Sequence, residues 1–253
     1  MTNNKPIFAI IMAAGQGKRI NAQDIPKVLY PVCGRPMLRY VYGAIKNLAD
    51  EVVIVTGYQR TKVEAEMAGE KVKFAHQAKQ LGTAHAVLQA EELLKGKEGI
   101  VLIANGDGPL FTEATFRELF RDVASNGYTL AISSAIEDDH PSYGRVLRDK
   151  RGKVLGIREA KDASPEELKI KEKNPGIYAV KSGWLWPALK KINKSKVTDE
   201  YYITDLVEIA VGEGREVEAI PMKNPCEIQG VNTLEELHRV EEVLGCRKKI
   251  PNI

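Results

Sequence analysis

The sequence has few cysteines and histidines and little net charge, and each shortage excludes a class of protein. Cys33, Cys226 and Cys246 are widely spaced among 253 residues, and no C-x-x-C motif occurs. This odd, scattered set predicts neither a disulfide framework nor a zinc site and favours a reducing cytoplasm. The four histidines form no metal-ligand pattern. A net charge of +3, with acidic and basic residues mixed throughout, argues against a nucleic-acid partner.

Long hydrophobic runs are also missing. The N-terminal apolar run, residues 7–14, is eight residues long, whereas a membrane span needs about 20. A glycine-rich basic loop follows it directly, so a buried parallel strand is a better interpretation than a signal peptide. Overall, 43% hydrophobic and 28% charged residues are typical of a soluble globular protein, and we expect no membrane partner.

Strand-like and helix-like segments alternate through the first half of the chain. The predicted strands are 7–12, 51–55, 71–75, 99–104 and 129–135, and the predicted helices are 37–48, 60–67, 83–94 and 112–125, the last capped by Thr112. This β-α-β-α rhythm predicts an α/β fold with a Rossmann-like mixed, mainly parallel sheet and helices on both faces.

The rhythm changes after Asp138. A hairpin is expected at 144–148 and 153–158, then strands at 176–180 and 216–220 and helices at 182–192, 203–212 and 234–244. Repeats and linkers are absent. We therefore expect one domain over residues 1–253, in which residues 138–232 add a substrate-facing region to the first half, 1–137, and residues 233–253 hold a final helix.

A glycine-containing loop follows the first predicted strand, where open parallel sheets bind their ligands. Gly15 and Gly17 would let backbone N–H groups approach phosphate oxygens, and Arg19 and Lys27 would add positive charge. The loop has neither the third glycine of a dinucleotide motif nor the G-K-[ST] of a P-loop. On its own the loop is as consistent with a plain turn as with a phosphate site.

Several polar residues have two interpretations. Asp107 follows another predicted strand, where it is a natural Mg²⁺ ligand, but its neighbours are all turn formers. Asn232 precedes the last helix and by itself is read as an N-cap. Glu159 and Asn174 would be surface polar residues on composition alone. The residues themselves leave these alternatives open.

Taken together, the motifs resemble the sugar-1-phosphate nucleotidyltransferases. They are closest to the uridylyltransferase domain of the bacterial bifunctional N-acetylglucosamine-1-phosphate enzymes. The matching segments occur in order over nearly the whole chain: 13–19, 26–29, 77–86, 106–110, 143–145, 159–163, 174–178, 200–205 and 230–232. The resemblance implies a nucleotide-diphospho-sugar transferase fold. It also implies synthesis of UDP-N-acetylglucosamine and pyrophosphate from UTP and N-acetylglucosamine 1-phosphate, with Mg²⁺ as cofactor.

The resemblance also implies a role for each matching residue. Residues 1–137 would be the nucleotide-binding half and 138–232 the sugar-binding half. Arg19 and Lys27 would be catalytic, and Asp107 and Asn232 would hold Mg²⁺. The nucleotide would be bound by Ala13, Ala14, Gly15, Gly17, Gln77, Gln80, Gly82 and Thr83, and the sugar by Asn105, Gly144, Glu159 and Asn174.

The chain departs from the family pattern in three places. Pro175 replaces the usual threonine, and Leu234 stands where arginine is common. The hexapeptide repeats of the acetyltransferase half do not occur, so a uridylyltransferase without acetyl transfer is expected, whether free-standing or shortened. Competing hypotheses are uridylyl transfer to a glucose- or galactosamine-type sugar, a silent nucleotide-sugar-binding paralogue, and a glycosyltransferase. The hypothesis of a catalytically silent paralogue is disfavoured because the expected catalytic and metal-binding residues are present: Arg19, Lys27, Asp107 and Asn232.

Overall fold

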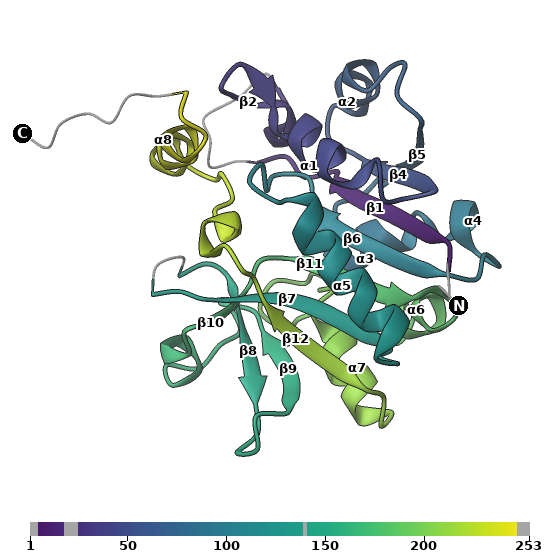
Figure 1. Ribbon diagram of the computed structural model, residues 1–253, viewed down its shortest axis with the longest axis vertical. Helices are drawn as coiled ribbons and strands as arrows, with labels where there is room; N and C mark the ends of the chain where they lie inside the picture. Colours follow the sequence, from purple (N-terminus) through teal and green to yellow (C-terminus); the bar gives the residue numbers. More distant parts are fainter. Residues whose placement is uncertain (1–4, 18–24, 139–140, 247–253) are drawn as a thin grey trace, which may run out of the picture.

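A ten-stranded mixed sheet forms the centre of the computed structural model, which describes residues 5–17, 25–138 and 141–246 (Figure 1). The strand order is β5-β4-β1-β6-β11-β7-β10-β8-β9, and β12 also pairs with β7. The strands are β1 (Ile7–Ala13), β4 (Glu51–Thr56), β5 (Val72–His76), β6 (Ile100–Asn105), β7 (Leu130–Ile136), β8 (Gly144–Arg148), β9 (Val154–Arg158), β10 (Glu172–Asn174), β11 (Ile177–Lys181) and β12 (Val217–Pro221). A small hairpin, β2 (Pro31–Val32) with β3 (Arg35–Pro36), stands apart.

Helices cover both faces of this sheet (Figure 1). They are α1 (Met37–Ile45), α2 (Arg60–Glu66), α3 (Thr83–Leu88), α4 (Glu91–Leu94), α5 (Glu113–Ser125), α6 (Ser182–Leu189), α7 (Asp205–Gly212) and α8 (Leu234–Val243), with 3-10 turns η1 (Lys27–Leu29), η2 (Glu167–Lys169) and η3 (Pro225–Ile228). The predicted cap on α5 is confirmed, since the Thr112 hydroxyl accepts a hydrogen bond from Thr115 N. The expected helix 83–94 is divided into α3 and α4.

The alternation of side chains along β1 explains why both faces are covered. Phe8, Ile10 and Met12 pack into one core cluster, with α3, α6 and α7. Ala9 and Ile11 point the opposite way, into a second cluster with α1, α2 and α5. Because successive strand residues face opposite sides, an uninterrupted apolar run requires a layer of helices on each face. The predicted α/β fold with a mixed sheet is confirmed.

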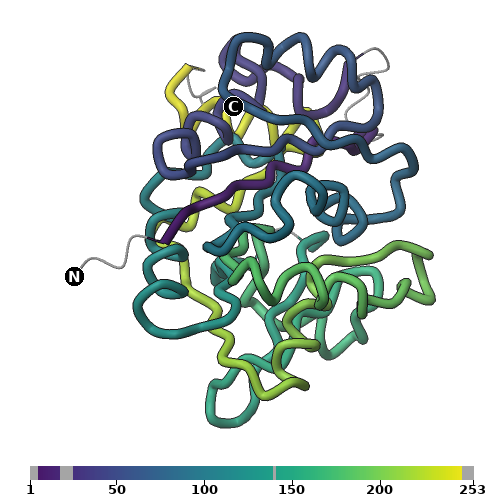
Figure 2. The backbone as a smooth tube through the Cα atoms, turned by 90° about the vertical axis from the view of Figure 1, so that its right-hand side faces the viewer, coloured from purple at the N-terminus to yellow at the C-terminus, as the bar shows by residue number. Residues whose placement is uncertain are grey.

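The second half of the chain extends the same sheet. β11 inserts between β6 and β7 and runs antiparallel to both, while β12 returns to lie parallel to β7. The hairpin β8–β9 forms as predicted and joins the sheet through β10, which was not expected. β10 consists of three polar residues, and its pairing with β7 and β8 comes from distant parts of the chain. Figure 2 shows the two halves stacked, with the first half above.

The C-terminal helix α8 packs on the β2–β3 hairpin rather than on the main sheet. Val240 of α8 is buried against Val32 and Met37. This packing brings Cys33 and Cys246 within 5.7 Å between Cα atoms, and the two form a disulfide. The cysteine count and spacing predicted no disulfide framework, so a disulfide between these two cysteines was not expected. Their separation of 213 residues hides the pairing from the sequence, and the cysteine pattern no longer supports a reducing compartment.

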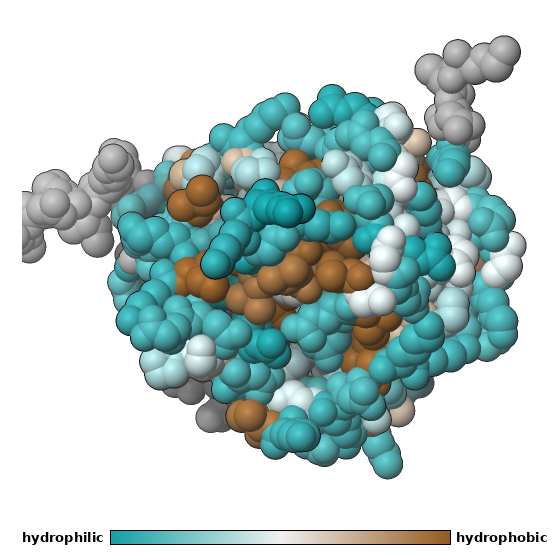
Figure 3. All heavy atoms as spheres, turned by 90° about the horizontal axis from the view of Figure 1, so that it is seen from below, coloured by the Kyte–Doolittle hydropathy of each residue, from teal (hydrophilic) through white to brown (hydrophobic). Residues whose placement is uncertain are grey.

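Hydrophilic side chains cover most of the face drawn in Figure 3, and apolar groups show mainly in its hollows. Within the described residues, no helix is both long and apolar enough to cross a membrane.

Candidate active site

Two adjoining cavities open where β1 and β6 end, at the carboxyl edge of the parallel strands. The larger has a volume of about 660 Å³ and the smaller about 250 Å³. Asn105, Asp107 and Lys161 line both, so the cavities meet at these three residues. Their volumes suit a nucleotide in one and a smaller group in the other. Of the expected site residues, those lining the larger cavity are Ala14, Gly15, Gly17, Lys27, Gln77, Gln80, Gly82, Thr83, Asn105 and Asp107.

The glycine-containing loop forms one wall of the larger cavity. Ala13 ends β1, and the Ala14 carbonyl accepts a hydrogen bond from Tyr58 N at 3.0 Å. Gly17 adopts φ +67°, and a Cβ on it would lie 2.3 Å from the Lys27 Cβ. Glycine is therefore needed where the loop passes the Lys27 side chain. Arg19 lies outside the described residues.

Lys27, Asp107 and Asn232 meet at the junction of the two cavities. The Lys27 ammonium donates hydrogen bonds to Asp107 Oδ2 and, at 2.6 Å, to Asn232 Oδ1. The lysine comes from η1, the aspartate follows β6 and the asparagine precedes α8, so three distant segments converge here. Thr233, not Asn232, caps α8, which removes the N-cap interpretation of Asn232.

The two oxygen donors at this junction fit a magnesium ion. An ammonium already lies between Asp107 Oδ2 and Asn232 Oδ1, so both oxygens face one point that a cation can occupy. Mg²⁺ needs few protein oxygens when substrate phosphates and water complete its shell. Within the described part of the chain, no group of three histidine, cysteine or acidic residues forms a site made of protein ligands alone.

A turn between β5 and α3 forms the opposite wall of the larger cavity. Gln77 is 3% exposed, and its Nε2 donates to the Gly82 carbonyl at 3.0 Å. Gln80 is exposed and donates to the Gln77 backbone carbonyl at 3.2 Å. The Thr83 hydroxyl accepts from Ile203 N at 2.9 Å, which ties the turn to the second half of the chain.

Gly82 has no room for a side chain. Its φ is +108°, and a Cβ there would lie 2.4 Å from the Tyr201 carbonyl oxygen and 2.6 Å from Tyr201 N. Tyr201 N in turn donates to the Leu81 carbonyl at 2.8 Å. The close backbone contact fixes the turn and so the position of Gln77.

Three of the four expected sugar residues, Gly144, Glu159 and Asn174, lie close together but line neither cavity. Gly144 and Asn174 are partners in the β8–β10 ladder, and the Glu159 carboxyl carbon lies 3.8 Å from where a Cβ on Gly144 would be. Asn174 is buried, so its interpretation as a surface residue was wrong. Its amide donates to Tyr178 Oη at 2.8 Å and accepts from Gly176 N at 3.1 Å.

The Glu159 carboxylate accepts a hydrogen bond from the Thr204 hydroxyl at 3.0 Å. Burial raises the pKa of Glu159 above its ordinary value. Asn105, Asp107 and Asn232 line the smaller cavity directly, whereas Gly144, Glu159 and Asn174 line neither cavity. Pro175, the departure from the family pattern, does line the smaller one.

Sequence reasoning missed two residues of the site. Lys161 lies at the junction of the cavities, where its ammonium adds a second positive charge. Tyr143 lines the smaller cavity; its hydroxyl donates to the Ile228 carbonyl at 2.8 Å and accepts from Gly230 N at 3.0 Å. It thereby holds the segment that leads to Asn232. Both residues lie inside segments that match the family, and this match was the sequence signal that could have identified them.

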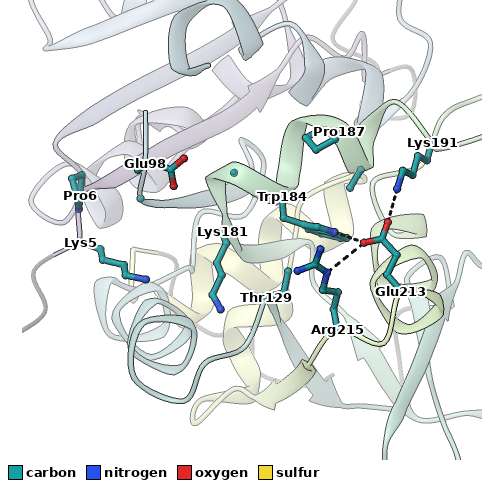
Figure 4. Close-up of a pocket in the computed structure, with 13 residues that line it drawn as sticks. Lys5, Pro6, Glu98, Thr129, Lys181, Trp184, Pro187, Lys191, Glu213 and Arg215 are labelled. Atoms are coloured by element: carbon teal, nitrogen blue, oxygen red, sulfur yellow. Dashed lines mark hydrogen bonds and ion pairs between the residues drawn. The ribbon is translucent and has the colours of Figure 1, made fainter. Parts of the chain in front are cut away.

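A third cavity, of about 630 Å³, lies at the opposite, amino-terminal edge of β1 and β6 (Figure 4). Glu213 accepts hydrogen bonds there from Trp184 Nε1 at 2.8 Å and Lys191 Nζ at 2.6 Å, and Arg215 pairs with it. None of the residues predicted for the active site lines this cavity. Lys191 and Arg215 are thus neutralised by Glu213, and the residues expected to bind ligand lie at the other edge of the sheet.

The fold is an α/β sheet with two cavities that meet at the carboxyl ends of its parallel strands. Comparison with known proteins makes the class specific. The family model described as "Nucleotidyl transferase" matches residues 8–225. The chain belongs to this nucleotidyl transferase family, which confirms the resemblance found in the sequence.

Curated relatives carry the name "Bifunctional protein GlmU". Those from Pelotomaculum thermopropionicum and Caldanaerobacter subterraneus subsp. tengcongensis are each 44% identical over 242 residues, which is 95% of this chain and 52% of the relative. The one from Desulfotalea psychrophila is 36% identical over 249 residues, 98% of this chain and 73% of the relative. The chain thus spans about half the length of the first two relatives.

Proposed function

We propose that this chain is a sugar-1-phosphate uridylyltransferase that forms UDP-N-acetylglucosamine and pyrophosphate from UTP and N-acetylglucosamine 1-phosphate. The observation that carries the proposal is the junction of the two cavities. There Lys27 lies between the oxygens of Asp107 and Asn232, with Lys161 nearby. A nucleotide in the larger cavity and a sugar phosphate in the smaller would meet at this point.

In this proposal the backbone of the first loop binds the triphosphate. Gly15 and Gly17 allow close approach of phosphate oxygens, and Ala13 and Ala14 face the nucleoside. The turn that contains Gln77, Gln80, Gly82 and Thr83 surrounds the uracil. Asn105 contacts the sugar directly, and Gly144, Glu159 and Asn174 complete the sugar subsite from behind the wall. Arg19 adds charge beside the pyrophosphate.

The reaction is a displacement at phosphorus. An oxygen of the sugar 1-phosphate forms a bond to the α-phosphorus of UTP, and the bond from that phosphorus to the bridging oxygen of pyrophosphate breaks. Phosphate monoesters have a second pKa near 6, so the attacking oxygen is anionic at neutral pH. No general base is required. The protein's work is therefore to align the two phosphates and to stabilise charge.

Lys27 supplies part of the positive charge that stabilises the phosphates. With both substrates bound, its ammonium moves from the carboxylate of Asp107 to the phosphates, within reach of a flexible side chain. A magnesium ion at Asp107 and Asn232 supplies charge neutralisation and a fixed orientation of the phosphate oxygens. Lys161 holds the phosphate of the incoming sugar from the far side of the junction.

Two substrate preferences follow. Gln77 and Gln80 can pair with uracil, whereas cytosine presents the opposite donor–acceptor pattern and leaves buried groups unpaired at about 1–3 kcal/mol each. Thymine differs from uracil only by a methyl group, so we expect dTTP to be excluded less strongly than CTP. In the sugar subsite, Pro175 removes a hydroxyl from the wall of the smaller cavity. Pro175 also restricts Asn174 to extended backbone, which opens the subsite to other hexose phosphates.

A substrate panel tests these preferences separately. We expect kcat/KM with UTP to exceed that with CTP by about 10-fold or more, the equivalent of one unpaired buried polar group. Among sugars we expect N-acetylglucosamine 1-phosphate to be preferred over glucose 1-phosphate. Equal use of CTP would refute the base preference alone. A clear preference for glucose 1-phosphate would refute only the sugar, and the enzyme would then serve another sugar phosphate.

A further inference from the structure

The side-chain nitrogen of Gln77 lies within hydrogen-bond distance of two acceptors in the protein. Its Nε2 lies 3.0 Å from the Gly82 carbonyl oxygen and 3.0 Å from Nδ1 of His85. The glutamine follows β5 and is 3% exposed, and the histidine lies in α3 and is half-buried. The two side chains therefore meet directly behind the wall of the nucleotide cavity.

These contacts determine which end of the amide is free. A primary amide has two N–H donors on nitrogen and an acceptor oxygen. A backbone carbonyl can only accept, so Gly82 fixes the nitrogen of Gln77 on its side. If the second N–H goes to His85 Nδ1, both donors are used within the protein. Only Oε1 then remains to face a ligand in the cavity that Gln77 lines.

His85 must be neutral, with Nδ1 unprotonated, to accept this bond. Burial lowers the pKa of His85, which keeps the ring neutral near pH 7. On the other side of the ring, Gln89 Nε2 lies 3.3 Å from Nε2 and donates to the His85 backbone carbonyl at 2.9 Å. A neutral ring accepts through one nitrogen only. The Gln77 contact is the shorter, and the Gln89 amide nitrogen already has an acceptor in the His85 carbonyl.

We propose that His85 is a positioning residue for nucleobase selection, which it achieves by holding the Gln77 amide with Oε1 toward the base. An oxygen there accepts the N3–H of uracil and faces the N3 lone pair of cytosine. His85 would thus act on the base through Gln77, without contacting it. The inference rests on the proposed use of a uridine nucleotide.

Three variants test this role by calorimetric binding of UTP and CTP with Mg²⁺ and without sugar phosphate. His85→Leu removes the acceptor, and we expect the preference for UTP to fall by about 2- to 10-fold, the worth of one net hydrogen bond. His85→Asn places an amide oxygen where Nδ1 was and should restore most of the preference. Gln89→Ala changes the other side of the ring and should leave the preference unchanged.

A second readout does not depend on nucleotide binding or on the Leu variant folding. The ¹⁵N chemical shifts of the wild-type His85 ring should report an unprotonated Nδ1 and a protonated Nε2. The Nδ1–H tautomer, or an unchanged UTP-to-CTP ratio in folded His85→Leu, would overturn the inference while leaving the proposed function intact. If the wild-type chain binds CTP as well as UTP, the proposed base preference fails instead.

Discussion

Replacing Asp107 with alanine should remove most nucleotidyl transfer while the fold remains intact. The variant loses a carboxylate at the junction of the two cavities, where the proposed Mg²⁺ would bind. We expect kcat/KM at limiting Mg²⁺ to fall by at least about 10²-fold, the order for loss of one charge-stabilising group. Higher Mg²⁺ should restore part of the loss, because Asn232 and the substrate phosphates still offer oxygens.

The structural cost of this change should be small. The Asp107 side chain is 29% exposed, and its partner Lys27 can turn toward solvent. A partly exposed ion pair contributes about 1 kcal/mol or less, so the melting temperature should shift by roughly 2–4 °C at most. Asp138→Ala is a matched control, since this aspartate pairs with Lys171 at the surface. Near-normal turnover in folded Asp107→Ala at limiting Mg²⁺ would exclude the metal role.

Replacing Lys27 with alanine should lower kcat by about 10²-fold or more. The side chain is 12% exposed and lies where the phosphates of both substrates would meet. If its charge acts on the transition state, kcat and kcat/KM fall together. Lys27→Arg keeps the charge with a different geometry and should retain more activity than alanine.

The split between kcat and KM decides the interpretation of this variant. A rise in KM with unchanged kcat would mean that Lys27 binds substrate and transition state equally, which contradicts the proposed role. Lys223→Ala serves as the control, because Lys223 pairs with Glu118 on the surface, away from both cavities. Its rate constants should match those of the wild type.

The sequence predicted the fold well wherever local periodicity decided the structure. The apolar run of β1, the cap at Thr112 and the β8–β9 hairpin each carry their signal within a few residues. β10 carries none, because its three polar residues become a strand only by pairing with β7 and β8. The Cys33–Cys246 disulfide likewise depends on how α8 packs, which spacing along the chain does not reveal.

In the candidate site, too, some features have a local sequence signal and others depend on tertiary packing. Asp107 and Lys27 each follow a recognisable local pattern, but neither pattern states that the two side chains meet. Asn232 joins them from a position 205 residues beyond Lys27, and only the fold brings it there. The positioning role of His85 could not be predicted for a different reason. A single histidine in a helical segment forms no recognisable motif, and its contact with Gln77 depends on the geometry of the turn at Gly82.

The most direct test of the account is pyrophosphate release by the purified wild-type chain supplied with UTP and Mg²⁺. We predict release only when a sugar 1-phosphate is added, fastest with N-acetylglucosamine 1-phosphate, together with one UDP-sugar for each pyrophosphate. Nucleotide binding without turnover on any sugar 1-phosphate would contradict the account and indicate a silent paralogue. Pyrophosphate release that does not depend on a sugar phosphate would contradict it as well, since the attacking oxygen would then be water.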